Sequence, residues 1–177
     1  MKITESSAKV DILTGAIVGA MLTAALTAIF YLAWSLVGLP FVAFDVFDWM
    51  SRKLPGVIIT FGIDSMVSVI RALDLGTTAE AAKAAEQAMA IAGMFATGVI
   101  TGAIVFAIAH RLGRNWAVFI GLVAGLAVGL PCMLISTSVG QTGTTSHLLS
   151  SVWILGSFLI WGAALGWGFQ KLNPDEA

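Results

Sequence analysis

The stretch ILTGAIVGAMLTAALTAIFYLAWSLV, residues 12–37, contains no Asp, Glu, Lys or Arg. A helix needs about 20 mostly apolar residues to cross the hydrocarbon core of a bilayer. This stretch is long enough to cross as one continuous helix. It is also longer than the apolar core of a signal peptide, which has about 7–15 residues. We therefore expect it to be retained as a membrane-spanning helix.

Three further stretches have the same two properties. They are residues 88–109, 116–135 and 148–169, and none of them contains a charged residue. Over the whole chain of 177 residues, 58% are hydrophobic and 11% are charged, whereas soluble domains have about 25% charged residues. The sequence therefore predicts an all-α membrane protein, a four-helix transmembrane bundle that forms one membrane domain over residues 1–177.

Charge and cysteine content exclude several kinds of site. The net charge of −1 offers no basic surface for nucleic acid. The single cysteine, Cys132, lies in an apolar run and can form neither an intrachain disulfide nor a cysteine-based metal cluster. We expect it to be a small buried hydrophobic residue.

Lysine and arginine set the expected orientation. Lys2 and Lys9 precede the first span, Arg111 and Arg114 separate the second from the third, and Lys171 follows the fourth. With four spans these five residues fall on one side, which is the cytoplasmic side by the positive-inside rule. We therefore expect both termini in the cytoplasm.

The segment between the first two spans is expected to lie in the membrane interface, as helical pieces over residues 41–73. Residues 57–73 have a broad apolar face and a polar stripe, which is typical of a helix lying in the interface plane. A fifth span through these residues is the alternative, but it would place Asp64 in the hydrocarbon at a cost of about 2.5–3.5 kcal/mol. The polar stripe consists of Thr60, Asp64, Ser65, Ser68 and Arg71.

Each predicted span contains glycines four residues apart. Lipid supplies no hydrophobic drive between helices, so close backbone approach at small residues has to hold them together. We expect these glycines to be the helix-packing residues. They are Gly15, Gly19, Gly98, Gly102, Gly121, Gly125, Gly129, Gly162 and Gly166.

The short string Thr-Gly-Ala-Ile-Val occurs twice, at residues 14–18 and 101–105. An inverted repeat would indicate a transporter. The match covers five residues drawn from few residue types, so we interpret it as a coincidence.

No candidate catalytic residues emerge, and no metal or cofactor is predicted. The predicted spans carry no ionisable side chain, which argues against a proton pump or an ion-coupled carrier. His110 and His147 are weak candidates for binding a haem or a chlorin singly. They cannot share one iron, because about 30 Å of hydrocarbon separates the two ends of the bundle on which they fall.

The stretch from residue 39 to residue 92 resembles the N-terminal membrane region of some bacterial sulfite-oxidase-like molybdopterin oxidoreductases. The resemblance implies a membrane anchor in the bacterial cytoplasmic (inner) membrane, without the pterin-binding domain, and it transfers no catalytic residue. The strings that carry it are Pro40-Phe41, Phe44-Asp45-Val46-Phe47-Asp48-Trp49, Leu54-Pro55-Gly56, Thr60-Phe61-Gly62-Ile63-Asp64 and Ala79-Glu80-Ala81-Ala82-Lys83-Ala84-Ala85-Glu86-Gln87.

These observations favour a non-catalytic membrane subunit that anchors or docks a redox partner. Asp45, Asp48, Asp64 and Arg71 are the candidate docking residues for that protein. Two alternatives stay open: an accessory structural subunit of a respiratory or photosynthetic membrane complex, and a small transporter or channel. In each case the chain acts in the lipid bilayer, and in the first two cases within a complex.

Overall fold

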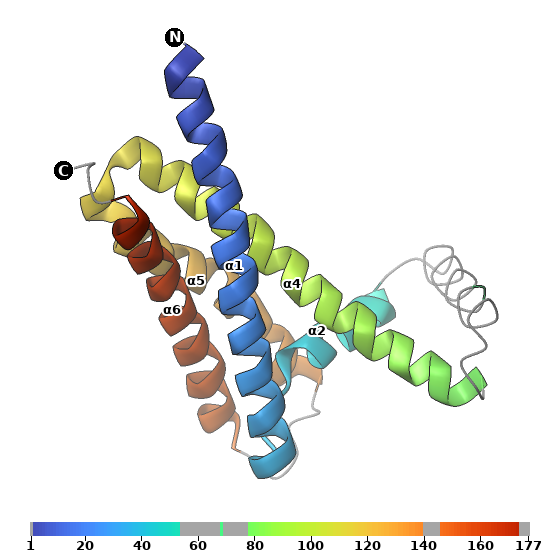
Figure 1. The fold of residues 1–177 in the computed structure, drawn as a ribbon. Coiled ribbons are helices and arrows are strands. Elements are labelled where there is room, and N and C mark those ends of the chain that lie inside the picture. Colours follow the sequence, from blue (N-terminus) through green and yellow to red (C-terminus); the bar gives the residue numbers. More distant parts are fainter. Residues whose placement is uncertain (1, 54–67, 69–77, 140–145, 174–177) are drawn as a thin grey trace.

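The structure is a computed structural model that describes residues 2–53, 68, 78–139 and 146–173. In these residues the chain forms five α-helices and one short 3₁₀ helix, with no strand (Figure 1). The helices are α1 (Lys2–Val37), α2 (Val42–Lys53), α4 (Thr78–Leu112), η1 (Arg114–Trp116), α5 (Ala117–Val139) and α6 (His147–Leu172).

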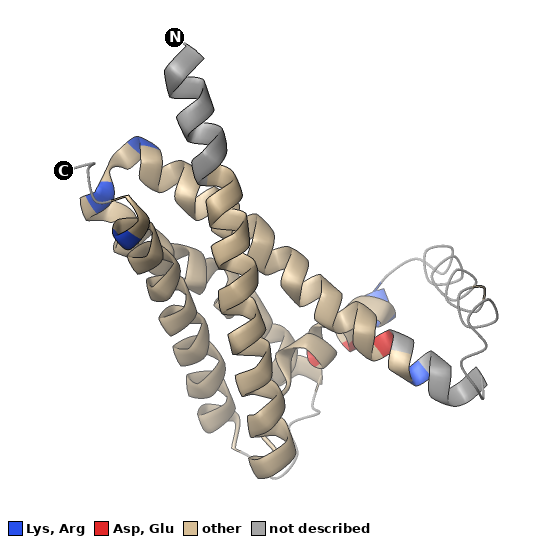
Figure 2. Ribbon diagram, in the orientation of Figure 1, with Lys and Arg blue, Asp and Glu red and all other residues tan. Residues whose placement is uncertain are grey.

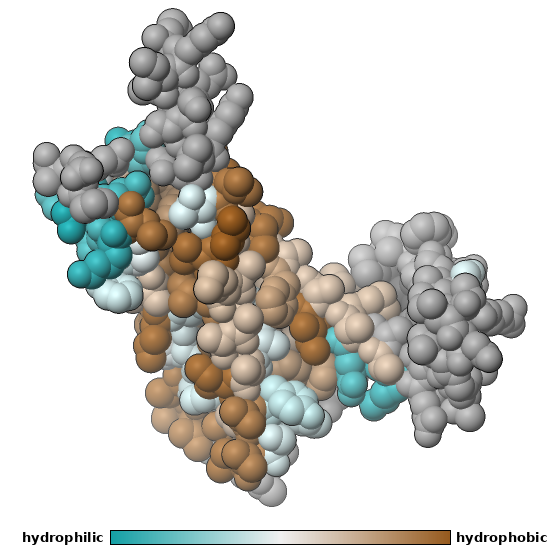
Figure 3. Space-filling view, viewed as in Figure 1, coloured by the Kyte–Doolittle hydropathy of each residue, from teal (hydrophilic) through white to brown (hydrophobic). Residues whose placement is uncertain are grey.

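Four of these helices are long and apolar enough to cross a membrane. Their candidate spans are Ile12–Val37, Glu86–Leu112, Arg114–Val139 and His147–Leu172. The predicted all-α fold with four spans is therefore confirmed. Between 17% and 33% of the residues in the most apolar window of each span are buried by the protein itself. Most of the apolar surface thus faces outward (Figure 3), as lipid rather than water would require.

Two helix pairs make up the bundle. α1 packs mainly against α4, and α5 packs mainly against α6. Contacts between the pairs are fewer, and the largest set joins α1 to α6. The core between them is aromatic and aliphatic. Phe30, Phe106, Ile154, Leu165 and Phe169 are fully buried there, and Phe106 meets Phe169 edge to face at 5.2 Å between ring centroids.

Two glycines end helices with a positive φ angle, which side chains with a Cβ rarely adopt. Gly38 follows α1 with a φ of 69°, and its N–H donates to the carbonyl of Trp34 at 3.1 Å. Gly113 follows α4 with a φ of 91°, and its N–H donates to Ala109 at 2.9 Å. The turn at Gly38 sends the chain back toward the bundle, where Pro40 precedes α2.

Charged side chains lie at opposite ends of α4 (Figure 2). Arg111, Arg114 and Lys171 lie at the end of the bundle near both termini. The start of α4 instead projects away from the other helices, beside α2 (Figure 1).

Helix α2 belongs to the segment predicted to lie in the membrane interface, residues 41–73, and its exposure increases along its length, from a buried start to Trp49 and Met50, which are exposed. It packs against α5 and α4, and Phe41, Val42 and Ala43 are buried at its start. The turn at Gly38 and an aromatic cluster place it there. Phe41 and Phe44 stack edge to face at 4.4 Å between centroids, and both rings contact Trp34 of α1. Residues 57–73, including the alternative fifth span, lie outside the described residues, apart from Ser68.

Candidate functional site

The candidate site is built around α2, which separates two hollows of opposite character. Its side chains alternate with a helical period between an apolar face and a polar face. Val42, Ala43, Val46 and Met50 line an apolar cavity on the bundle side, together with Phe47. The other face carries Asp45, Asp48 and Ser51 and lines a polar pocket.

The polar pocket has a volume of about 400 Å³ and lies between α2 and the start of α4. Helix α4 contributes Lys83, Glu86 and Gln87 to it, and α1 contributes Trp34. Carboxylates, one ammonium group and one amide thus face a common space. This composition suits polar contacts with another molecule.

Asp45 is the most unusual residue of the site, because a carboxyl group is buried beside a span. Its side chain is 6% exposed, and Ser136 of α5 donates a hydrogen bond to its Oδ2. Burial raises the pKa of Asp45 above its ordinary value of 3.8; the Ser136 hydrogen bond lowers it in part, and the charge of Asp48 raises it further. Burial also withdraws Asp45 from the surface, which argues against its predicted role in docking.

Asp48, the second docking candidate, faces the polar pocket and forms an ion pair within its own helix. The Oδ2 atom of Asp48 lies 2.7 Å from Nη2 of Arg52, and Oδ1 accepts a second bond from Nε at 3.2 Å. The pair is well exposed, so it contributes little to stability. The remaining docking candidates, Asp64 and Arg71, lie outside the described residues.

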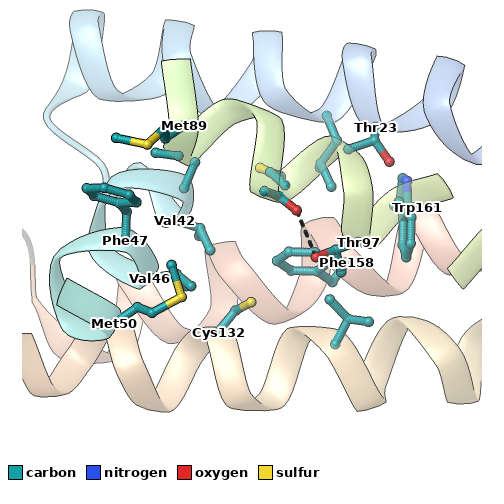
Figure 4. Close-up of a pocket in the computed structure, with 17 residues that line it drawn as sticks. Thr23, Val42, Val46, Phe47, Met50, Met89, Thr97, Cys132, Phe158 and Trp161 are labelled. Carbon is teal, nitrogen blue, oxygen red and sulfur yellow. Dashed lines mark hydrogen bonds between the residues drawn. The ribbon is translucent and has the colours of Figure 1, made fainter. Parts of the chain in front are cut away.

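The apolar cavity on the other side of α2 has a volume of about 200 Å³ (Figure 4). All five α-helices contribute to its lining. Met50, Met89, Gly93 and Thr97 are lining residues that are exposed. Among the residues that the structure describes, no Asp, Glu, Lys, Arg or His lines it. The Asp45–Ser136 bond lies on the polar side, so α2 divides polar from apolar space.

All nine predicted packing glycines lie where two helices touch. On the α1–α4 pair, a Cβ at Gly15 would lie 2.5 Å from the carbonyl oxygen of Gly102, and one at Gly102 would meet the oxygen of Gly15. Gly19 and Gly98 make the neighbouring contact, and Thr23 fills the space beside Gly98. The helices are therefore antiparallel and separated by backbone alone.

The α5–α6 pair repeats this arrangement. Gly121 and Gly162 each lie against the other's carbonyl oxygen, and Gly166 lies against Ala117. Gly125 and Gly129 accommodate Phe158, whose Cβ would be 2.7 Å from a Cβ added at Gly129. Helix α5 continues through Pro131 to Val139.

The repeated string Thr-Gly-Ala-Ile-Val has a structural explanation. Its two copies contain Gly15 and Gly102, which pack directly against each other. In an antiparallel pair, equal small residues on both helices allow the same close approach from both sides. The prediction that the repeat does not mark a transporter remains untested, but the two copies do share one contact.

The two histidines lie at opposite ends of the bundle. Gln170, near the end of α6, donates to the carbonyl of Arg114 at 2.9 Å, which places that end beside the end of α4 and therefore beside His110. His147 begins α6, and a helix of this length spans about 39 Å. Among the described residues, no group of three or more His, Cys, Asp or Glu side chains could hold a metal ion.

Sequence reasoning missed the burial of Asp45. Asp45 lies two positions beyond Val42 and Ala43, which are buried, and its partner Ser136 is 91 positions away. The signal available was the amphipathic period of residues 42–53, which is as compatible with a membrane interface as with a bundle crevice.

A comparison of the chain with family models, curated proteins and solved structures found no match.

Proposed function

We propose that the chain is a non-catalytic integral membrane subunit that anchors a redox partner, which docks on the polar surface formed by α2 and the start of α4. The observation that carries the proposal is the distribution of charge. Residues 12–37, 88–109, 116–135 and 148–169 have no charged residue, while Asp48, Arg52, Lys53, Lys83 and Glu86 gather where α4 projects from the bundle (Figure 2).

The projecting part of α4 supports this proposal on physical grounds. α4 has 35 residues, whereas about 20 suffice to cross the bilayer. A helix that extends beyond the hydrocarbon and carries charges of both signs presents a surface for electrostatic complementarity with a protein. The resemblance of residues 39–92 to the membrane region of molybdopterin oxidoreductases supports a redox enzyme as the partner.

Orientation is part of the proposal. With Arg111, Arg114 and Lys171 in the cytoplasm of a bacterial cell, the α2–α4 surface would face the opposite side of the inner membrane. The partner would then be a protein exported across that membrane.

Site-specific crosslinking in native membranes tests the proposal. A photoreactive amino acid would replace Trp49, which is exposed on α2, or Trp167, which is exposed near the far end of α6. We expect position 49, and not position 167, to crosslink a protein that carries a redox cofactor detectable by its absorbance. Recovery of the chain alone from both positions, in mild detergent, would contradict the proposal.

A charge reversal supplies a matched control. Lys83→Glu changes the proposed docking surface, whereas Lys171→Glu makes the same change at the other end of the bundle. We expect only Lys83→Glu to lower the yield of the crosslinked partner.

A further inference from the structure

The apolar cavity beside α2 runs from the exposed surface to the centre of the bundle. Its outer end is formed by Met50, Met89 and Gly93, all of which are exposed. Its inner end is closed by Phe158 and Trp161, which are 3% and 5% exposed. A molecule dissolved in the hydrocarbon could therefore enter from the side, without crossing polar surface.

Water is a poor occupant for this cavity. A buried water needs about two to four polar partners, and apolar cavities of this size stay dry. The two hydroxyls in the lining already donate to their own helices, Thr23 to Gly19 at 2.7 Å and Thr97 to Gly93 at 2.9 Å. The thiol of Cys132 is only a weak donor and acceptor.

One strong donor in the lining has no acceptor. The Nε1 atom of Trp161 is buried and has no hydrogen-bond partner in the described part of the chain. Figure 4 shows the ring at one end of the cavity, with its nitrogen on the side of Thr23. Buried indole N–H groups usually find a partner, and each exception calls for an explanation. A bound molecule with an acceptor oxygen would supply one.

The remaining lining favours a flat ring over a flexible chain. Phe47, Phe158 and Trp161 present aromatic faces and edges, and Met50, Met89 and Met94 supply thioethers that contact rings favourably. The volume of about 200 Å³ exceeds the roughly 150 Å³ of an apolar cavity that holds benzene. A substituted ring of one or two fused cycles is therefore of suitable size.

We propose that this cavity binds a neutral, lipid-soluble ring compound of the quinone class, with one carbonyl oxygen accepting a hydrogen bond from Trp161. Because none of the described residues that line the cavity carries a charge, a neutral head is favoured over a fatty acid or a phosphate. An acyl chain would fill the space but would leave the indole N–H without an acceptor. The inference does not depend on the proposed anchoring of a redox partner.

A pair of matched ligands tests this binding site. Menadione (2-methyl-1,4-naphthoquinone) and 2-methylnaphthalene share the same ring skeleton, and only the first has carbonyl oxygens. Binding to the purified full chain in lipid nanodiscs would be measured by equilibrium dialysis, with empty nanodiscs correcting for partition into lipid. We expect menadione to bind about five-fold more tightly, as one net hydrogen bond would give.

Two variants then locate the hydrogen bond. In Trp161→Phe the advantage of menadione is expected to disappear, while binding of 2-methylnaphthalene is retained. Trp153→Phe is the matched control, because Trp153 also has a buried Nε1 without a hydrogen-bond partner among the described residues but does not line the cavity. Equal loss in both variants, or an advantage that persists in Trp161→Phe, would overturn the proposal.

A third variant closes the entrance and does not depend on the folding of the tryptophan variants. A Cβ at Gly93 would meet nothing within 4 Å, so Gly93→Phe adds a ring at the outer end without displacing backbone. We expect it to weaken menadione binding at least ten-fold. Unchanged binding would show that menadione binds elsewhere, and equal binding of the two ligands to the wild type would show that no hydrogen bond to a carbonyl contributes; either result would overturn the proposal.

Discussion

Single glycines set the distance between helices in this bundle. In lipid, apolar side chains gain little by leaving their surroundings, so the attraction between helices comes from dense contact of backbones. Where a carbonyl oxygen of one helix faces a glycine of the other, as Gly121 and Gly162 do in both directions, one methyl group would push the helices apart.

Gly162→Ala is expected to destabilise the protein by about 1–3 kcal/mol, the usual cost of overpacking. An added Cβ would meet the carbonyl oxygen of Gly121 and lie 2.9 Å from the Cα of Gly125. Gly156→Ala is the control in the same helix, because its Cβ would meet nothing within 4 Å, and it should be neutral or slightly stabilising. Reversible unfolding in mixed micelles measures both; equal losses would contradict the packing argument.

Asp45 is expected to make stability depend on pH. Because burial raises its pKa above 3.8, the folded state binds the proton more tightly than the unfolded chain does. Relative to Asp45→Asn, the wild type should be most stable below pH 3.8, lose stability as the pH rises from there, and level off above the raised pKa. Unfolding both proteins over a series of pH values measures the difference, and a constant difference would contradict the burial of the carboxyl group.

Ser136→Ala extends this prediction. The Ser136 hydrogen bond lowers the pKa of Asp45, so its removal should raise that pKa further. The stability of Ser136→Ala would be compared with that of the double variant Asp45→Asn/Ser136→Ala. As the pH rises, Ser136→Ala should go on losing stability relative to this reference up to a higher pH than the wild type does relative to Asp45→Asn. A loss that ends at the same pH would show that the serine does not act on the carboxyl group.

At the scale of elements, the start of α6 offers a local test. Ser146 is the N-cap, and its Oγ accepts a hydrogen bond from the N–H of Leu149 at 3.3 Å. Ser146→Ala should therefore cost about 1 kcal/mol and speed amide exchange in the first turn of α6. Ser151→Ala removes only a hydroxyl that donates to the carbonyl of His147 and should leave that exchange unchanged. Equal effects would argue against the cap.

The spans were predictable because each depends on local composition alone. A run without charge that is long enough for the bilayer has to satisfy its backbone within itself, and residues 116–135 and 148–169 differ from the observed helices only at their ends. The packing glycines were also visible, because their spacing puts them on one helix face. Which helices pair was not predictable, since α1 joins α4 through residues about 80 positions apart.

The site around α2 was predictable only in part. The sequence indicates helical pieces over residues 41–73, but carboxylates among aromatic residues do not say whether water, headgroups or Ser136 will face them. The apolar cavity and the unpaired Nε1 of Trp161 arise from five helices together, and no local pattern encodes them.

At the scale of the whole molecule, the proposed orientation predicts how labels reach the two ends. In a Cys132→Ala background, a cysteine at Glu86 should react in intact cells with a reagent that does not cross the inner membrane. A cysteine at Arg114, at the other end of α4, should react only after the membrane is opened. Both side chains lie outside the buried core, so the reverse pattern would show the opposite orientation.

The pairing of α1 with α4 has a consequence for biosynthesis. α5 and α6 follow each other and can join as a hairpin, but Gly19 leaves the ribosome about 80 residues before its counterpart Gly98. At about 5–20 residues per second, the first helix waits roughly 4–16 s with its glycine face open to lipid or to the insertion machinery. The final architecture is thus completed in an order that differs from the order of translation.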